Sequence, residues 1–267
     1  MYNPETVYKY DALWLAQHNN GKTPSLKCNY HQYSCTGKVN GINTNVDMDY
    51  YFEKEKIKSS MDFSKYYGMI SNSGSDERGK ASGGQAGDQT YREWQIKSWY
   101  NRPWDCILRY PDQNVGNLIA ELGIEAANNN LIGYNQSKRY TYWDHLKASN
   151  YRPSQITIAC DADCSAGVIA NTRAVGYLLE IPALQNITAT YTGNMRSSFK
   201  KAGFQVLTAS KYLNSYDYLL PGDILLNDVH HTATNLGIGK YATYTSSVPT
   251  STKTTLIGKN ITSTKTS

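Results

Sequence analysis

The sequence has no long apolar run. None of its 267 residues lies in a stretch approaching the roughly 18 apolar residues that a membrane-spanning helix needs, so we expect no membrane span. The first residues also lack the basic segment and apolar core of a secretory signal peptide. We therefore expect cytoplasmic synthesis without a signal peptide.

Metal, nucleotide and nucleic-acid signatures are missing as well. The sequence contains no zinc-ligand spacing, no Gly-rich phosphate loop and no run of basic residues. The net charge of +5 mildly favours an anionic partner such as a cell wall, but it does not form a nucleic-acid signature. We expect no cofactor, no metal ion and no nucleic-acid partner.

Cysteine is scarce: the sequence has five, an odd number that cannot all form pairs within the chain. The spacing of the five cysteines is not typical of a disulfide framework, so we expect free thiols in a protein made in a reducing cytosol. A Cys28–Cys35 pair is the alternative that the sequence leaves open. The five are Cys28, Cys35, Cys106, Cys160 and Cys164.

The chain has the composition of a globular protein. Hydrophobic residues make up 40% and charged residues 18%, and the length suffices for one large or two small domains with a core. Tyrosine is unusually common, with 23 copies. Aromatic-rich polar surfaces suit glycan or peptide grooves, although tyrosine also fills cores.

A candidate nucleophile stands where a short alternating segment meets a helical one. Residues 155–158 (QITI) alternate in character, and residues 169–179 are apolar and free of proline. Cys164 therefore falls at or near a helix N-terminus. Unpaired N–H groups and the positive end of the helix dipole lower the pKa of a thiol there, and the thiolate is the reactive form.

A candidate base follows in His230 and His231, which precede residues 232–237 (TATNLG). A nucleophilic cysteine and a histidine that the fold brings together form the arrangement that cysteine hydrolases need. Five cysteines and five histidines allow many pairings. On spacing alone, a buried thiol and a structural imidazole are an equally good interpretation.

The residues around both positions resemble a known family. Residues 163–168 (DCSAGV) are similar to the Asp-Cys-Ser-x-x-Val motif of the NlpC-type cell-wall cysteine peptidases, papain-like enzymes that cut the peptides of peptidoglycan. Residues 221–226 (PGDILL) and 231–237 (HTATNLG) resemble the Gly-Asp strand and the His strand of that family. Residues 87–104 and 130–136 resemble a branch found in phage-type endolysins.

This resemblance implies an α+β, papain-like fold in which a helix-borne nucleophile packs on a small antiparallel sheet. It implies that Cys164 and His231 are catalytic and that Asp163 supports the turn. His231 is preferred over His230 because it directly precedes the TATNLG strand, and adjacent strand residues face opposite sides.

The residue that orients the imidazole is the point where the sequence departs from the family. In the family it normally lies on the next strand, which here corresponds to residues 241–246. No His, Asn or Gln stands there, so Thr243, a water molecule or a backbone carbonyl are the candidates.

The N-terminal residues resemble a different family. Residues 14–17 (WLAQ), 31–34 (HQYS) and 46–49 (VDMD) are similar to the last barrel strands of glycoside hydrolase family 25 lysozymes. The strands that carry that family's acidic pair are absent, and glycoside hydrolysis needs two carboxylates. We expect a truncated C-terminal fragment of a β/α barrel without muramidase activity, in which Asp47 is at most one wall of a sugar cleft. A strand-rich surface extension is the alternative.

The sequence thus divides into a lysozyme-like fragment, a charged linker, a cysteine peptidase domain, and a Ser/Thr/Lys-rich tail or linker that we expect to be disordered. In order, these segments are residues 1–52, 53–65, 66–245 and 246–267. Patterning predicts helices over residues 115–128, 140–149, from 164 onward, and 194–202, and strands over residues 106–110, 204–208, 223–226 and 232–236. Residues 95–100 alternate in character, which predicts a strand or the end of a helix.

The expected peptidase domain also contains a polar, glycine-rich stretch and a group of aromatic residues. Residues 71–87 are rich in Gly, Ser and Asp, and we expect a loop in which Asp76 and Glu77 form a solvated turn. Trp99, Tyr100 and Trp104 cluster, and they either line a substrate cleft or fill the core.

Together these features predict a peptidoglycan hydrolase that acts at the bacterial cell wall in a phage or prophage context. It would cut an amide bond of the stem peptide by a Cys-His thiolate mechanism, with peptidoglycan as its partner. Two alternatives stay open. One is an N-acetylmuramoyl-L-alanine amidase that uses the same residue pair, and the other is a non-catalytic wall-binding remnant of a lysin.

Overall fold

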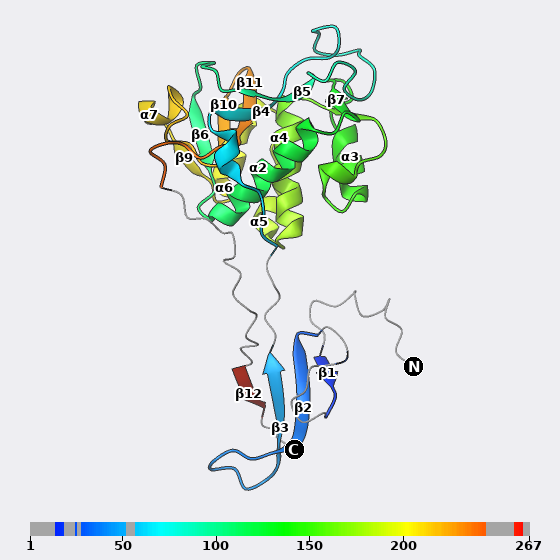
Figure 1. The fold of residues 1–267 in the computed structure, drawn as a ribbon, viewed down its shortest axis with the longest axis vertical. Helices are drawn as coiled ribbons and strands as arrows, with labels where there is room; N and C mark the ends of the chain where they lie inside the picture. Colours follow the sequence, from blue (N-terminus) through cyan, green and yellow to red (C-terminus); the bar gives the residue numbers. More distant parts are fainter. Residues whose placement is uncertain (1–13, 19–24, 26–27, 52–56, 244–258, 264–267) are drawn as a thin grey trace. The chain divides into compact units, whose positions relative to one another are not determined.

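The computed structural model describes residues 14–18, 25, 28–51, 57–243 and 259–263. The chain forms two compact units (Figure 1). The smaller one comprises residues 1–56 and 249–267, and the larger one comprises residues 57–248. Both chain ends therefore belong to the smaller unit.

The smaller unit contains a mixed sheet with the strand order β1-β2-β3-β12. Its strands are β1 (Trp14–Ala16), β2 (Tyr30–Gly37), β3 (Val46–Tyr51) and β12 (Lys259–Ser263). Strand β12 lies in the tail for which composition predicts disorder, and that prediction is wrong for Lys259–Ser263. The strand forms because it pairs antiparallel with β3, a partner far away in the sequence.

The acidic residues of β3 have different surroundings. Asp49 is buried, and its carboxylate accepts a hydrogen bond of 2.9 Å from the indole Nε1–H of Trp14. Asp47 is only half-buried. Asp49 thus holds β1 to β3, a structural role. The resemblance of this unit to the end of a lysozyme barrel stays a prediction.

The larger unit is built on a six-stranded antiparallel sheet with the order β5-β4-β11-β10-β6-β9. Its strands are β4 (Met69–Ser73), β5 (Trp94–Ser98), β6 (Cys106–Arg109), β9 (Gln205–Leu207), β10 (Ile224–Asn227) and β11 (His231–Asn235). A separate parallel pair consists of β7 (Ile132–Tyr134) and β8 (Cys160–Ala162).

Helices α2 and α4 pack against one face of this sheet and against each other (Figure 1), whereas the short α7 packs against the cluster on the opposite face. The helices are α2 (Gln113–Ala127), α3 (Thr141–Ala148), α4 (Cys164–Leu178), α5 (Pro182–Gln185), α6 (Thr192–Lys201) and α7 (Ser210–Leu213), with 3₁₀ turns η1 (Phe63–Tyr66) and η2 (Pro153–Gln155). The four predicted helices are confirmed to within a few residues at their ends, and so is the α+β class. Within the described parts of the chain, no helix is long and apolar enough for a membrane crossing.

One expected loop contains a strand. Residues 71–73, assigned to the loop 71–87 from their composition, are the C-terminal half of β4. Strand β4 lies between β5 and β11, and its residues Ser71, Asn72 and Ser73 are buried. Small polar residues normally mark turns, so the prediction failed where tertiary pairing overrides local preference.

The two faces of the sheet pack differently. The helix-facing side belongs to the main hydrophobic core, which includes Leu118, Val168 and Leu226. The opposite side forms a smaller cluster of buried apolar residues, with aromatic side chains packed around it. The buried members of that cluster are Ile70, Trp104, Ile107, Leu219, Leu225 and Ala233.

Candidate active site

Cys164 is the first residue of α4, as its sequence context predicts. The preceding Asp163 is the N-cap, and its carboxylate accepts hydrogen bonds from the Ala166 backbone N–H at 2.7 Å and the Ser165 hydroxyl at 2.9 Å. An aspartate in this position satisfies N–H groups that have no partner inside the helix. Asp163 therefore fixes the point where α4 begins, and with it the position of the Cys164 thiol.

Arg139, which lies outside α4, binds the residues at the start of this helix. Its guanidinium forms an ion pair of 2.7 Å with Asp163 and a hydrogen bond of 3.0 Å with the Ser165 hydroxyl oxygen, and it also bonds the Thr190 carbonyl. Sequence reasoning missed this residue. Arg139 lies in a polar loop before α3, and nothing in that loop's composition points to a partner in another element.

Gly167, in the same motif, allows α4 to approach the sheet closely. A Cβ atom at this position would lie 2.5 Å from the nearest ring carbon of Trp94 in β5. The Trp94 indole N–H donates to the Ser71 hydroxyl at 2.8 Å, and that hydroxyl donates to the Gly123 carbonyl in α2 at 2.8 Å. The ring is thus fixed in place, so the helix residue facing it has to lack a side chain.

His231 is the first residue of β11, and its side chain is buried, whereas the neighbouring His230 is exposed. The imidazole Nε2 lies 2.8 Å from the side-chain oxygen of Asn72 in β4. Because that oxygen only accepts hydrogen bonds, Nε2 carries the proton and Nδ1 keeps a free lone pair. The Trp104 ring stacks on the imidazole at 6.2 Å between centroids.

The fold brings the helix of Cys164 against the strand of His231, because α4 packs against β11. The backbone N–H groups of Thr232, the residue after His231, and of Ser165 lie near enough to the Cys164 sulfur to favour its thiolate. The two residues that the sequence singled out are therefore the first residues of two elements that pack together.

The partner of the imidazole is not where the family resemblance places it. Residues 241–243 form no strand, and residues 244–246 lie outside the described residues. Strand β4, which precedes the cysteine helix in sequence, occupies the position next to β11 and supplies Asn72. Tyr100 donates a second hydrogen bond of 3.0 Å to the same Asn72 oxygen.

Burial governs the protonation of both groups. It raises the pKa of the Cys164 thiol to about 11, with Asp163 acting in the same direction and the Thr232 and Ser165 N–H groups and Arg139 opposing it. Burial likewise lowers the pKa of His231 to about 4, and two nearby cations add to the effect. The lowered thiol pKa expected from the helix N-terminus is therefore wrong. The neutral thiol and the neutral imidazole are favoured because burial desolvates both groups.

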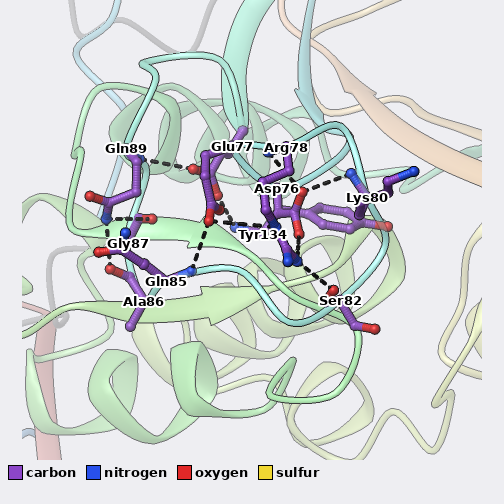
Figure 2. Close-up of polar contacts among 11 residues, drawn as sticks. Asp76, Glu77, Arg78, Lys80, Ser82, Gln85, Ala86, Gly87, Gln89 and Tyr134 are labelled. Carbon is purple, nitrogen blue, oxygen red and sulfur yellow. Dashed lines mark hydrogen bonds and ion pairs between the residues drawn. The ribbon is translucent and has the colours of Figure 1, made fainter.

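Figure 2 shows the loop between β4 and β5 together with Tyr134 of β7. Burial raises the pKa of Tyr134 to about 12, and the nearby Cys164 adds to this effect. Asp76, expected in a solvated turn, is instead buried. Its carboxylate accepts hydrogen bonds from the backbone N–H groups of Arg78 at 3.0 Å and Lys80 at 2.7 Å, and from the Arg78 guanidinium at 2.6 Å. Asp76 holds the loop in shape, so it is a structural acid.

The loop is anchored at its other end by a second carboxylate. Glu93 is buried, and it accepts hydrogen bonds from the backbone N–H groups of Gln89 at 2.8 Å and Tyr134 at 3.0 Å. Gly87 N–H donates to Asp161, next to the cysteine motif, at 3.1 Å. These bonds tie the loop to the strands β7 and β8 that lead into the cysteine helix.

The described residues hold no group of three or more His, Cys, Asp or Glu side chains arranged to bind a metal ion. All five cysteines are free thiols, so the alternative Cys28–Cys35 disulfide is not formed. Cys106 and Cys160 are buried, and burial raises their pKa values to about 11 and about 12.

Comparison with known proteins gives one assignment. No curated protein and no solved structure matches the chain. A family model described as the endolysin-like domain matches residues 70–242. This range contains β5 through β11 and all of β4 except its first residue, and with them Asn72, Cys164 and His231. The chain therefore belongs to the endolysin-like domain family.

Proposed function

We propose that the larger unit is a cysteine-dependent peptidoglycan hydrolase that cuts an amide bond of the stem peptide. Cys164 is the nucleophile, His231 is the general base and acid, and Asn72 orients the imidazole. Membership in the endolysin-like family supports a phage-type, cell-wall lytic function. The papain-like arrangement and the cysteine chemistry are our additions.

One observation carries the proposal. The buried His231 donates from Nε2 to Asn72 at 2.8 Å, and the strand that it begins packs against the helix that begins at Cys164. A nucleophile, a base and a group that holds the base are the three parts that covalent acyl transfer needs.

In the first half of the reaction, the Cys164 sulfur attacks the peptide carbonyl carbon while the thiol proton moves to Nδ1 of His231. The carbonyl oxygen becomes an oxyanion. The Cys164 backbone N–H, in the first turn of α4, has no acceptor inside the helix and is available to stabilise it. When the C–N bond breaks, His231 returns the proton to the leaving amine, and a thioester remains.

In the second half, water attacks the thioester. His231 takes a proton from the water, the C–S bond breaks, and the proton passes to the departing Cys164 sulfur. The released peptide fragment has a new carboxylate, and the enzyme returns to its neutral thiol and imidazole. The lowered pKa of His231 suits this role because it favours the neutral ring, and only the neutral ring accepts a proton.

The test is release of soluble fragments from purified peptidoglycan by the parent chain and by the variants Cys164→Ser and His231→Ala. Cys160→Ala and His230→Ala are matched controls, since each changes the same residue type nearby. We expect both site variants to lose turnover and both controls to keep it. Turnover that persists in Cys164→Ser would overturn the proposal.

Mass spectrometry of the fragments identifies the bond. A new amino terminus within the stem peptide or its cross-bridge marks a peptidase, whereas free lactyl-muramate marks an N-acetylmuramoyl-L-alanine amidase. Wall binding without turnover in the parent and in every variant would favour a binding remnant.

A further inference from the structure

Lys97 shares a sheet face with His231 and Asn72. In the β4–β5 register Lys97 lies opposite Ile70, two residues before Asn72. Asn235 of β11 also lies opposite Ile70, and His231 is four residues before Asn235. Because alternate residues of a strand point to the same side, these side chains all project from one face.

A chain of contacts connects two cations to the base. The Lys97 ammonium lies 4.8 Å from the centre of the Tyr100 ring, and the Arg102 guanidinium is near enough to the Tyr100 hydroxyl to oppose the rise that burial causes in its pKa. That hydroxyl donates to Asn72 at 3.0 Å, and Asn72 accepts from His231 at 2.8 Å. Arg102 is exposed and Lys97 is half-buried, so both remain accessible to solvent.

The charged side chains near His231 are both positive. After desolvation, the groups that lower the pKa of His231 are Arg102 and Lys97. Within the described part of the chain, neither cation has a carboxylate within ion-pair distance. The base of the proposed reaction is therefore flanked by two positive charges that no acid balances.

Two such charges oppose proton transfer to His231. His231 becomes an imidazolium when it takes the thiol proton, and neighbouring cations disfavour that charged form. Only groups that stabilise the transition state more than the ground state accelerate a reaction. The two cations are therefore compatible with catalysis if the substrate itself brings a negatively charged group next to them.

We infer that Lys97 and Arg102 form a subsite for a carboxylate of the stem peptide close to the scissile bond, and that this substrate carboxylate balances their charge during proton transfer to His231. The inference rests on the proposed function and deepens it, because it names an anionic stem peptide as the preferred substrate. Lys97 and Arg102 are thus specificity residues.

The experiment uses two synthetic stem peptides that contain the bond cut in peptidoglycan. They differ only in whether the carboxylate nearest that bond is free or amidated. Values of kcat/KM are measured for the parent chain, Lys97→Met, Arg102→Gln and the control Lys200→Met, which removes an exposed positive charge on α6. Thermal unfolding of each variant shows that it is folded.

We expect the parent to prefer the free carboxylate by about tenfold, the size of one charge-assisted hydrogen bond. Lys97→Met and Arg102→Gln should lower kcat/KM on the carboxylate peptide. On the amidated peptide they should leave kcat/KM unchanged or raise it, because a cation that disfavours the imidazolium is gone. Lys200→Met should keep the preference of the parent.

Other outcomes overturn the inference. Equal kcat/KM on the two peptides in the parent would refute the subsite, and so would equal losses on both peptides in a folded Lys97→Met variant. If the parent releases no fragments from peptidoglycan, the proposed function itself fails, and the inference fails with it. The two failures are thereby distinguishable.

Discussion

Replacing Asn72 by alanine removes the only hydrogen-bond acceptor that the structure shows for the imidazole Nε2–H within its described residues. A neutral histidine carries its proton on either ring nitrogen. Asn72 favours the form protonated at Nε2, which leaves Nδ1 able to accept the thiol proton. Without Asn72, the other tautomer and other ring orientations become populated, and these cannot act as the base.

The structure sets the size of the effect. His231 is only 6% exposed, so solvent does not readily replace the lost acceptor. A buried donor left without a partner costs about 1–3 kcal/mol. If this cost falls on the productive orientation, kcat/KM decreases by a factor of roughly 5 to 150, since about 1.4 kcal/mol corresponds to tenfold. The free energy of unfolding should fall by a similar amount.

The assay measures kcat and KM on a stem peptide together with urea unfolding. Asn72→Ala should lower kcat and leave KM nearly unchanged, because Asn72 orients the base and does not bind substrate. Gln95→Ala is the matched control, since Gln95 lies opposite Asn72 in the β4–β5 register and bonds the Arg92 carbonyl. A folded Asn72→Ala variant with the kcat of the parent would refute the reasoning.

Two further substitutions test the packing around the site. Gly167→Ala places a Cβ 2.5 Å from the Trp94 ring, so it should lower the free energy of unfolding in urea by about 1–3 kcal/mol. The double variant with Trp94→Phe should lose less stability than the sum of the two single variants, because the smaller ring relieves the clash. Losses that simply add would contradict the contact between Gly167 and Trp94. Arg109→Met removes the bidentate partner of buried Asp223, at 2.8 and 2.5 Å, and should cost about 3–5 kcal/mol at neutral pH. Burial already raises the pKa of Asp223, and loss of the guanidinium raises that pKa further. The loss of stability should therefore grow as pH rises above the raised pKa of Asp223 in the parent, and a loss equal at about pH 4.5 and about pH 8 would contradict this account.

The sequence by itself determined the parts of the site whose signals are local. Asp163 followed by small and apolar residues places Cys164 at a helix start, because an N-cap side chain and the residues it caps are neighbours in the chain. The strand that begins at His231 follows from its own patterning, as do the four predicted helices. Each of these features depends on side chains a few residues apart.

Only the tertiary structure decided which residues surround Cys164 and His231. Asn72 lies in a polar stretch that composition assigns to a loop, yet it is in a buried strand because β5 and β11 supply its backbone partners. The burial that sets the protonation of Cys164 and His231 comes from packing and not from their neighbours in the chain. Asn72 and His231 are 159 positions apart. A hydrogen bond over such a separation depends on strand order in the sheet, and strand order leaves no local trace in the sequence.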